Sequence, residues 1–362
     1  MSIRVLVVED SLTVRMRLVE VLDAHPDFEV VGQASDGRAG IELCQKLRPD
    51  VVTLDMMLPI MSGLAATEYI MAYCPTPIVI VSASTNRGEL FKTYEALAAG
   101  AVDVLDKPLG GEANEDWDRR LFETLRIASR IKVITHPRLR LRPAMPGTAL
   151  ETPDRLASAR SSIPSAPGLS VVALGASTGG PSAVLNILQS LPASFPLPIL
   201  LVIHIGEPFG IALAEWLAGQ VALPVRCAKD GERLPEVGRP AVLMAPPEKH
   251  LALRGGRVWL TNDPPRFSCR PSVDVLFQSV AAEVGAGGVG CLLTGMGRDG
   301  ADGLLAMRRA GGRTIAQDET TCVVFGMPRE AILLGAAENV LPLGEIAPAL
   351  QRLVGSNGGG AS

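Results

Sequence analysis

The chain has 362 residues, too many for one ordinary domain and enough for two domains that each bury a sizeable core. Its formal net charge of −4 gives no electrostatic reason to expect nucleic acid or an anionic membrane as the main ligand. Residues 1–8 are too short an apolar run for a signal peptide, and prolines interrupt the most hydrophobic later stretch, 191–205. We therefore expect a cytoplasmic protein without membrane insertion, and its six cysteines, which form no C-x-x-C pair, to be reduced thiols.

The first part of the chain alternates short β-branched runs with helical patterns. The candidate strands are residues 4–8, 29–32, 51–54, 78–81 and 102–105. Strands that alternate with helices predict an α/β fold with a doubly wound parallel sheet. We assign residues 1–125 to this first domain.

A change of composition separates this domain from the next. Residues 126–168 are rich in Pro, Ser and Arg and predict a linker, and the absence of aromatic residues favours a solvated tether over a nucleic-acid arm. From 169 to 355 the alternation resumes, with apolar runs at 170–174, 198–203, 241–244 and 289–293. A second doubly wound α/β domain is expected there, and the Gly-rich residues 356–362 predict a disordered tail.

Polar side chains follow four of the strands predicted in the first domain. They are Glu9, Asp10, Asp55, Ser82 and Lys107. Each alone is also typical of a solvated loop acid or a capping serine, but the carboxyl ends of parallel strands converge on one edge of a sheet. Clustered carboxylates repel one another unless a cation lies among them, and hard oxygen ligands suit Mg²⁺. We expect the three acids to bind Mg²⁺ and Asp55 to accept a phosphoryl group, with Lys107 and Ser82 contacting its oxygens.

The segments around these residues are V-V-E-D-S, L-D-M-M-L-P-I-M-S-G, V-S-A-S and D-K-P. They resemble the signature segments of two-component receiver domains. The resemblance implies that a histidine kinase supplies the phosphoryl group to Asp55 and that Ser82 and Lys107 are the switch residues. Glu9 and Asp10 would be metal ligands. Val104 stands where receivers often carry an aromatic residue, so an aromatic switch is not expected.

The second domain carries G-A-S-T-G at residues 175–179, between a predicted strand and a helix that begins near Pro181. This pattern can hold a nucleophilic serine, Ser177, in a tight turn, but Gly-rich turns also bind phosphates. His204 and Asp299 each follow a predicted strand and reach the same sheet edge, so a base and an orienting acid for acyl transfer are present. The order Ser, His, Asp disfavours the α/β-hydrolases, although Asp230 and His250 could formally supply their order.

Four longer segments are G-A-S-T-G-G, R-P-S-V-D-V-L-F, L-T-G-M-G-R-D-G-A-D-G and T-I-A-Q-D-E-T-T-C-V-V-F-G-M-P-R-E-A. They resemble the chemotaxis protein-glutamate methylesterase family. The resemblance implies Ser177 as nucleophile, His204 as general base, Asp299 as orienting acid, the Met296 N–H as oxyanion donor and Thr178 as a residue lining the site. Methyl-accepting chemoreceptor helices would be the substrate, receptor glutamines would be deamidated, and the esterase would need no cofactor.

Two departures from that family concern the region around the base. The sequence after His204 is I-G-E-P, and Cys269 stands where relatives carry a histidine. These departures affect receptor recognition and not the chemistry, so an esterase with a partner from a non-chemotactic chemosensory pathway is one alternative. A signalling adaptor whose second domain only binds partners is another, whereas a DNA-binding effector is disfavoured because no basic helix-turn-helix is evident. We further expect the receiver to inhibit the esterase until Asp55 is phosphorylated.

Overall fold

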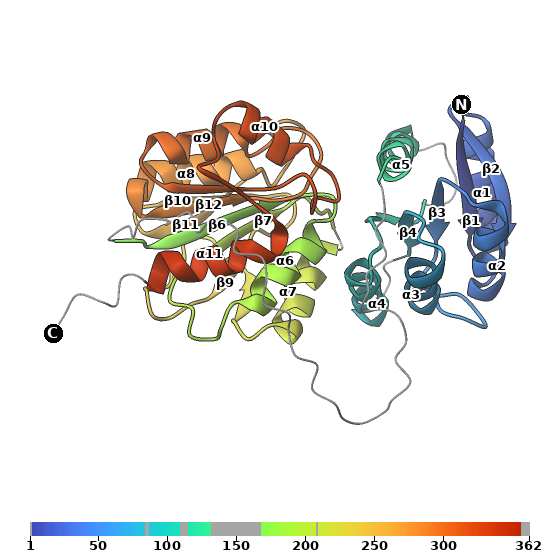
Figure 1. Cartoon of the computed structure of the whole chain (residues 1–362), viewed down its shortest axis with the longest axis horizontal. Helices are drawn as coiled ribbons and strands as arrows, with labels where there is room; N and C mark the ends of the chain where they lie inside the picture. The colour runs from blue at the N-terminus through green and yellow to red at the C-terminus, as the bar shows by residue number, and fades with distance from the viewer. Residues whose placement is uncertain (1, 84–86, 109–114, 132–167, 208, 356–362) are drawn as a thin grey trace, which may run out of the picture.

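The computed structural model describes residues 2–83, 87–108, 115–131, 168–207 and 209–355. Within these ranges, none of the helices combines the length and apolar character needed to cross a bilayer. The residues form two α/β domains (Figure 1). Most of the predicted linker and the predicted tail lie outside the described residues.

The first domain is built on a five-stranded parallel sheet with the strand order β2-β1-β3-β4-β5. Its strands are β1 (Ile3–Val8), β2 (Phe28–Ala34), β3 (Val51–Leu54), β4 (Ile78–Ser82) and β5 (Asp103–Asp106). Strands β3 and β4 are wholly buried and β1 is buried from Val5 onward, as expected when helices cover both faces of a parallel sheet.

Within the residues that the structure describes, five helices cover this sheet. They are α1 (Leu12–Asp23), α2 (Gly37–Leu47), α3 (Gly63–Tyr73), α4 (Arg87–Ala98) and α5 (Glu115–Ala128). Helices α1 and α5 share one apolar core with the sheet, and α2, α3 and α4 share the other. Asp36 and Ser62 cap the second and third helices through their side chains. Helix α5 extends past residue 125, where the sequence analysis placed the domain boundary.

The second domain contains a seven-stranded sheet with the order β14-β13-β12-β6-β7-β9-β8, and all of its pairs are parallel. The strands are β6 (Val171–Ala176), β7 (Ile199–Ile203), β8 (Val225–Cys227), β9 (Val242–Met244), β12 (Gly288–Leu292), β13 (Arg313–Gln317) and β14 (Asn339–Leu341). A separate antiparallel hairpin consists of β10 (His250–Arg254) and β11 (Arg257–Thr261).

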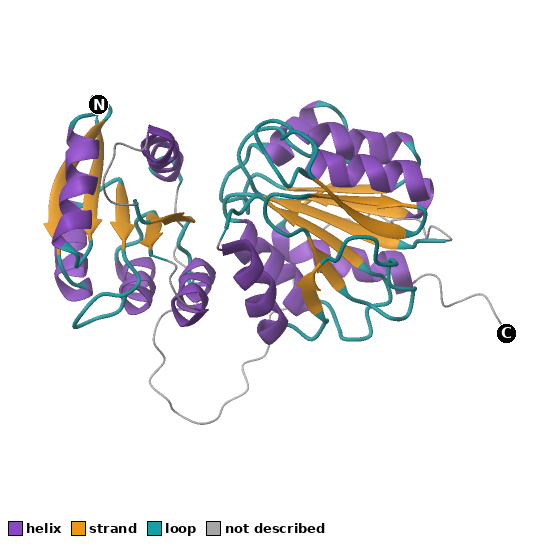
Figure 2. Cartoon of the chain, turned by 180° about the vertical axis from the view of Figure 1, so that it is seen from behind, coloured by secondary structure: helices purple, strands orange, loops and turns teal. Residues whose placement is uncertain are grey.

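Helices flank the larger sheet on both faces, so the second domain has three layers (Figure 2). One face carries α8 (Val273–Val284), α9 (Ala301–Arg309) and α10 (Met327–Leu333); the other carries α6 (Gly180–Ser190), α7 (Phe209–Gln220) and α11 (Leu343–Gly355) (Figure 1). The doubly wound α/β class predicted for both domains is confirmed. The hairpin and the short edge strands β8 and β14 were not anticipated.

The two domains pack together through α4 of the first and α6 and α7 of the second. The phenol of Tyr94 is fully buried, donates to the Phe209 carbonyl and lies 5.4 Å, ring to ring, from Trp216. Ser182 Oγ donates to the Leu97 carbonyl at 2.6 Å. An apolar core therefore continues from one domain into the other, and the contact is more than a loose tether.

Candidate active site and phosphorylation pocket

The carboxyl edge of the first sheet gathers Glu9, Asp55 and Lys107 from β1, β3 and β5. Lys107 Nζ lies 2.9 Å from Glu9 Oε1 and 3.0 Å from Asp55 Oδ2. Both carboxylates are 1% exposed, and Asp10, the next residue after Glu9, is exposed at the mouth. One carboxylate oxygen from each of the three acids lies within 4.8 Å of the others.

Lys107 does not fully neutralise the carboxylates that it contacts in this pocket. Burial, and then the charge of Asp55, raise the pKa of Glu9 to about 7 despite its bond with Lys107. Burial also raises the pKa of Asp55, and Lys107 only partly opposes it. Among the described residues, Glu9 Oε2 is buried with no hydrogen-bond partner. An unpaired buried oxygen in a set of hard oxygen donors fits a divalent cation such as Mg²⁺.

Ser82 ends β4 at the same edge but is bonded elsewhere. Its Oγ donates to Glu89 Oε1 on α4 at 2.7 Å, and Glu89 also accepts from the Ala83 N–H at 3.2 Å. Glu89 is a buried acid that the sequence analysis missed. Its place in the first turn of a helix gave no sign that it would reach the strand end.

The nucleophile candidate Ser177 lies in the turn between β6 and α6. Its N–H donates to the Thr294 carbonyl at 3.0 Å, and its own carbonyl accepts from Gly180. Gly179 adopts φ 75° at the N-cap of α6, where a side chain would strain the backbone and collide with Val323. Ser177 itself is half-buried at the helix N-terminus, where the helix dipole favours negative charge.

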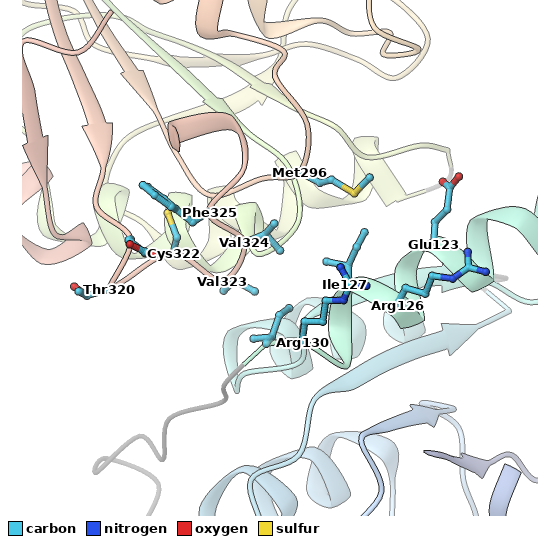
Figure 3. A pocket seen from close by; sticks show the side chains of 12 residues that line it. Glu123, Arg126, Ile127, Arg130, Met296, Thr320, Cys322, Val323, Val324 and Phe325 are labelled. Carbon is cyan, nitrogen blue, oxygen red and sulfur yellow. The ribbon is translucent and has the colours of Figure 1, made fainter. Parts of the chain in front are cut away.

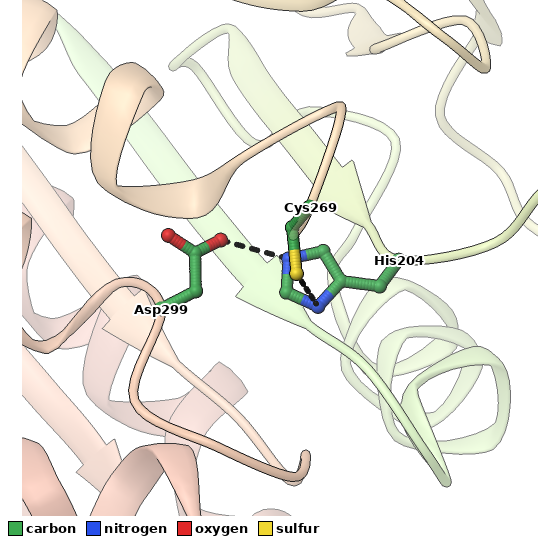
Figure 4. A group of neighbouring side chains, drawn as sticks. All are labelled: His204, Cys269 and Asp299. Atoms are coloured by element: carbon green, nitrogen blue, oxygen red, sulfur yellow. Dashed lines mark hydrogen bonds and ion pairs between the residues drawn. The ribbon is translucent and has the colours of Figure 1, made fainter. Parts of the chain in front are cut away.

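The strand order brings the other two predicted residues to the same place. Strands β12, β6 and β7 are neighbours, and Asp299, Ser177 and His204 follow them in that order. The His204 N–H donates to the Ala176 carbonyl at 3.0 Å, which places the histidine beside the serine turn. His204 Nε2 donates to Asp299 Oδ2 at 2.8 Å (Figure 4). Its Nδ1 is thus the nitrogen left for other chemistry.

Asp299 is held firmly at the N-terminus of α8. Besides His204, it accepts bonds from Ser272 Oγ at 2.7 Å, the Val273 N–H at 2.6 Å and the Asp274 N–H at 3.1 Å. Burial acts to raise its pKa, but these bonds and the charge of His204 together lower it. Asp299 is therefore a fixed anion that orients the imidazole.

The pair with Asp299 also changes His204. Burial favours the neutral ring, but the bonds to Asp299 and Cys269 outweigh it and raise the His204 pKa to about 9. Cys269 Sγ lies 3.7 Å from His204 Nδ1 (Figure 4). The sequence marks Cys269 as a departure from relatives, but only the fold makes it a direct neighbour of the histidine.

Ser272, which donates to Asp299, is a second residue that was not singled out from the sequence. His250 holds the backbone of Ser272 in place. His250 is fully buried, and its Nδ1 accepts from the Ser272 N–H at 3.1 Å while its Nε2 donates to the Pro264 carbonyl at 3.2 Å. Asp230 accepts from the Leu260 N–H. His250 is thus a structural residue behind Asp299, and the S-V-D pattern before a helix was the signal for the cap.

Met296 lies in the loop between β12 and α9 and is 48% exposed. The neighbouring Gly295 approaches Ser177 so closely that an added Cβ would meet the serine Cβ at 2.7 Å. Within the part of the chain that the structure describes, no hydrogen bond engages the Met296 N–H. That donor is therefore available to a ligand beside the serine.

A cavity of about 660 Å³ separates this loop from the first domain (Figure 3). Met296 and residues 319–320 and 322–325 line one side, and residues of α5, including Arg126, Ile127 and Arg130, line the other. Strand β5 also touches the serine turn, because Thr178 Oγ1 donates to Asp103 Oδ2 at 3.0 Å. Sequence alone gave no indication of the Asp103 contact.

Comparison with known proteins gives consistent results for both domains. A family model described as CheB methylesterase matches residues 172–350, and one described as response regulator receiver domain matches residues 5–114. The chain is 43% identical to the protein-glutamate methylesterase/protein-glutamine glutaminase of Nitrosospira multiformis, with 98% of each chain covered. It is 45% identical to an Anaeromyxobacter dehalogenans protein of the same name, with 96% of this chain and 98% of that one covered.

Among solved structures, the catalytic domain of Thermotoga maritima CheB methylesterase is 37% identical to the matched part. That match covers 51% of this chain and 98% of the other, with a TM-score of 0.49.

Proposed function

The chain belongs to the protein-glutamate methylesterase/protein-glutamine glutaminase family, and on this premise we propose that Ser177, His204 and Asp299 form its hydrolytic centre. The protein is a receiver-regulated enzyme that hydrolyses glutamate methyl esters of chemoreceptors and deamidates glutamines. The observation that carries the site assignment is the 2.8 Å His204–Asp299 pair beside the Ser177 turn.

The hydrolysis follows from the atoms available. Ser177 Oγ attacks the glutamyl carbonyl carbon while His204 Nδ1 accepts the hydroxyl proton, and the Met296 N–H donates to the developing oxyanion. Nδ1 then returns the proton to the departing methoxide oxygen, or to the amide nitrogen of a glutamine, so that methanol or ammonia leaves and an acyl-enzyme remains. Water, deprotonated by Nδ1, attacks the acyl carbon, and Nδ1 returns that proton to Ser177 Oγ as the ester bond breaks and the carboxylate is released. Asp299 fixes the ring and stabilises the imidazolium.

The receiver pocket would hold Mg²⁺ through Glu9, Asp10 and Asp55. When bound, the cation neutralises part of the negative charge on the incoming phosphoryl oxygens. Asp55 attacks the phosphorus of the histidine kinase phosphodonor, and Lys107, already 3.0 Å from Asp55, pairs with the transferred group. Ser82 would have to leave Glu89 before its hydroxyl could reach that group.

The same contacts support inhibition by the unphosphorylated receiver. Helix α5 lies across the cavity from Met296, and Asp103 of β5 holds Thr178, the residue after the nucleophile. A receptor helix cannot use that surface while the receiver occupies it. The break of the Ser82–Glu89 bond on phosphorylation would loosen α4, which carries the main contact to α6 and α7.

A pure adaptor role is not favoured, because full-length relatives at 43–45% identity carry the enzyme name. We place the protein in the cytoplasm, where chemoreceptor signalling helices and the kinase are accessible.

The decisive experiment measures methanol release from methylated receptor by the full chain with and without acetyl phosphate. Ser177→Ala should lower the rate by several orders of magnitude, about 10⁶-fold where the serine alone forms the acyl-enzyme. Ser190→Ala, which changes an exposed serine at the far end of α6 whose hydroxyl bonds within its own helix, is the matched control and should keep hydrolysis within tenfold. A folded Ser177→Ala protein that releases methanol at the native rate rules out the mechanism.

A further inference from the structure

The esterase site contains one residue that the proposed hydrolysis does not use. Cys269 Sγ lies 3.7 Å from His204 Nδ1, the nitrogen that would take the serine proton. Cys269, His204 and Asp299 each offer a ligand atom, and these atoms lie within 4.8 Å of one another (Figure 4). A thiol, an imidazole and a carboxylate are the side chains that bind zinc in proteins.

The spacing of the first two atoms suits a single metal ion. Zinc binds thiolate sulfur at about 2.3 Å and imidazole nitrogen at about 2.0–2.1 Å, with tetrahedral angles. Two such ligands lie about 3.6 Å apart. The observed separation of 3.7 Å between Sγ and Nδ1 is close to that value.

The histidine is already oriented as a zinc-binding histidine usually is. Such a ring donates its other N–H to a carboxylate, which fixes its tautomer. Here His204 Nε2 donates to Asp299, whose two oxygens are further occupied by Ser272 and the α8 backbone. Asp299 is therefore a positioning residue, and Nδ1 is the ring nitrogen that faces Cys269.

The cysteine is fixed by a tight turn. The Cys269 N–H donates to the Arg266 carbonyl at 2.8 Å, and the Arg266 N–H donates back to Cys269 at 3.1 Å. Phe267 and Ser268 between them both adopt positive φ, 49° and 63°, as in a type I′ turn. This turn holds Sγ next to the imidazole, so the site is organised before a metal arrives.

We propose that a thiophilic divalent cation of the Zn²⁺ class binds between Cys269 Sγ and His204 Nδ1 and reversibly inhibits the esterase. On binding, the thiol proton and, below pH 9, the proton carried by Nδ1 leave to solvent. Sulfur and nitrogen each donate an electron pair to the metal, water fills the remaining coordination positions, and nothing is oxidised or reduced. Nδ1 can then no longer accept the Ser177 proton. The inhibition, though not the binding, rests on the proposed function.

Ligand chemistry separates this site from the receiver pocket. Thiolate and imidazole select zinc-like ions, whereas the three carboxylates around Asp55 suit Mg²⁺. Saturating Mg²⁺ should therefore fill the receiver without competing at Cys269. The thiophilic ion can therefore be titrated while Mg²⁺ occupies the receiver pocket.

The binding test uses Co²⁺ as a spectroscopic stand-in for zinc on the full chain with saturating Mg²⁺. The wild type should develop a thiolate-to-cobalt charge-transfer band that saturates at one equivalent, and Zn²⁺ should displace it. Cys269→Ser should lose the band, whereas Cys227→Ser, which removes another half-buried thiol on the edge strand β8, should retain it. A band that survives Cys269→Ser, or that never forms in wild type, overturns the proposal.

The activity test compares zinc sensitivity within each variant. Wild type and Cys227→Ser should lose ester hydrolysis as Zn²⁺ is added and recover it with a chelator. Whatever its starting rate, Cys269→Ser should need at least about tenfold more Zn²⁺ for half-inhibition. Equal sensitivity of Cys269→Ser and wild type overturns the inhibition. A cobalt band in a protein that hydrolyses no ester would instead refute the proposed function while the metal site stands.

Discussion

The two strand-edge sites of this protein use buried carboxylates in opposite ways. In the receiver, Glu9 and Asp55 share one lysine, and burial raises the pKa of both. In the esterase, Asp299 is equally buried but accepts from a helix N-terminus, a serine and a histidine, and its pKa is lowered. An acid cluster whose negative charge is only partly neutralised is suited to bind a cation and attack phosphorus. An acid whose oxygens already accept several hydrogen bonds is suited to orient a base.

The most severe test of this difference between the two sites is to remove the charge of Asp299 while keeping the shape of its side chain. Asp299→Asn should reduce kcat by about 10⁴-fold, because the amide no longer stabilises the imidazolium and can favour the wrong histidine tautomer. Methanol release measures the rate, and thermal unfolding checks that the protein still folds. As a matched control, Asp302→Asn removes a partly exposed acid in the first turn of α9 that pairs with Arg298, and it should leave the rate within a few-fold. A loss below tenfold in Asp299→Asn would mean that the carboxylate only packs.

The corresponding change in the receiver tests the other half of the comparison. Asp55→Asn should abolish labelling by acetyl phosphate and Mg²⁺, because the amide cannot act as the nucleophile. Asp50→Asn, at the opposite end of β3, should be labelled as the wild type is. Incorporation of phosphate into the Asp55→Asn chain would move the acceptor elsewhere.

The raised pKa of His204 predicts that the esterase rate depends on pH. The base must be neutral, and its pKa is raised to about 9, so the active fraction is small below pH 8 and grows as pH rises through 9. The esterase kcat/KM should therefore increase about tenfold per pH unit below pH 8 and level off above 9, in assays corrected for spontaneous ester hydrolysis. Cys269→Ala removes one group that raises this pKa and should move the profile to lower pH. A flat profile from pH 7 to 9 would contradict the assignment of His204 as the base.

The smallest expected effect is that of breaking the Thr178–Asp103 hydrogen bond, which links the receiver to the serine turn of the esterase. Asp103→Ala removes the bond to Thr178, about 1 kcal/mol, and should raise the activity of the unphosphorylated full chain about fivefold. Asp106→Ala, which removes a carboxylate of the same strand paired with Arg120, is the control and should not raise it. Unchanged activity in Asp103→Ala would separate this bond from the gate.

The amino-acid sequence by itself determined the two parallel-sheet domains and the edge at which the polar residues meet. Buried strands of Val, Ile and Leu carry a strong local signal, and the end of each strand dictates which edge the next side chain reaches. Ser177, His204 and Asp299, like Glu9, Asp55 and Lys107, could be placed together for this reason.

Only the tertiary structure decided which atoms meet at those edges. The Ser82–Glu89 bond, the anchoring of Asp299 on α8, the Cys269–His204 contact and the Thr178–Asp103 bond each join residues on different elements. Such contacts depend on rotamers, on turn geometry and on how one domain packs on the other, none of which leaves a periodic trace in the sequence. The pKa values follow from the same packing, because burial and partner distance set them.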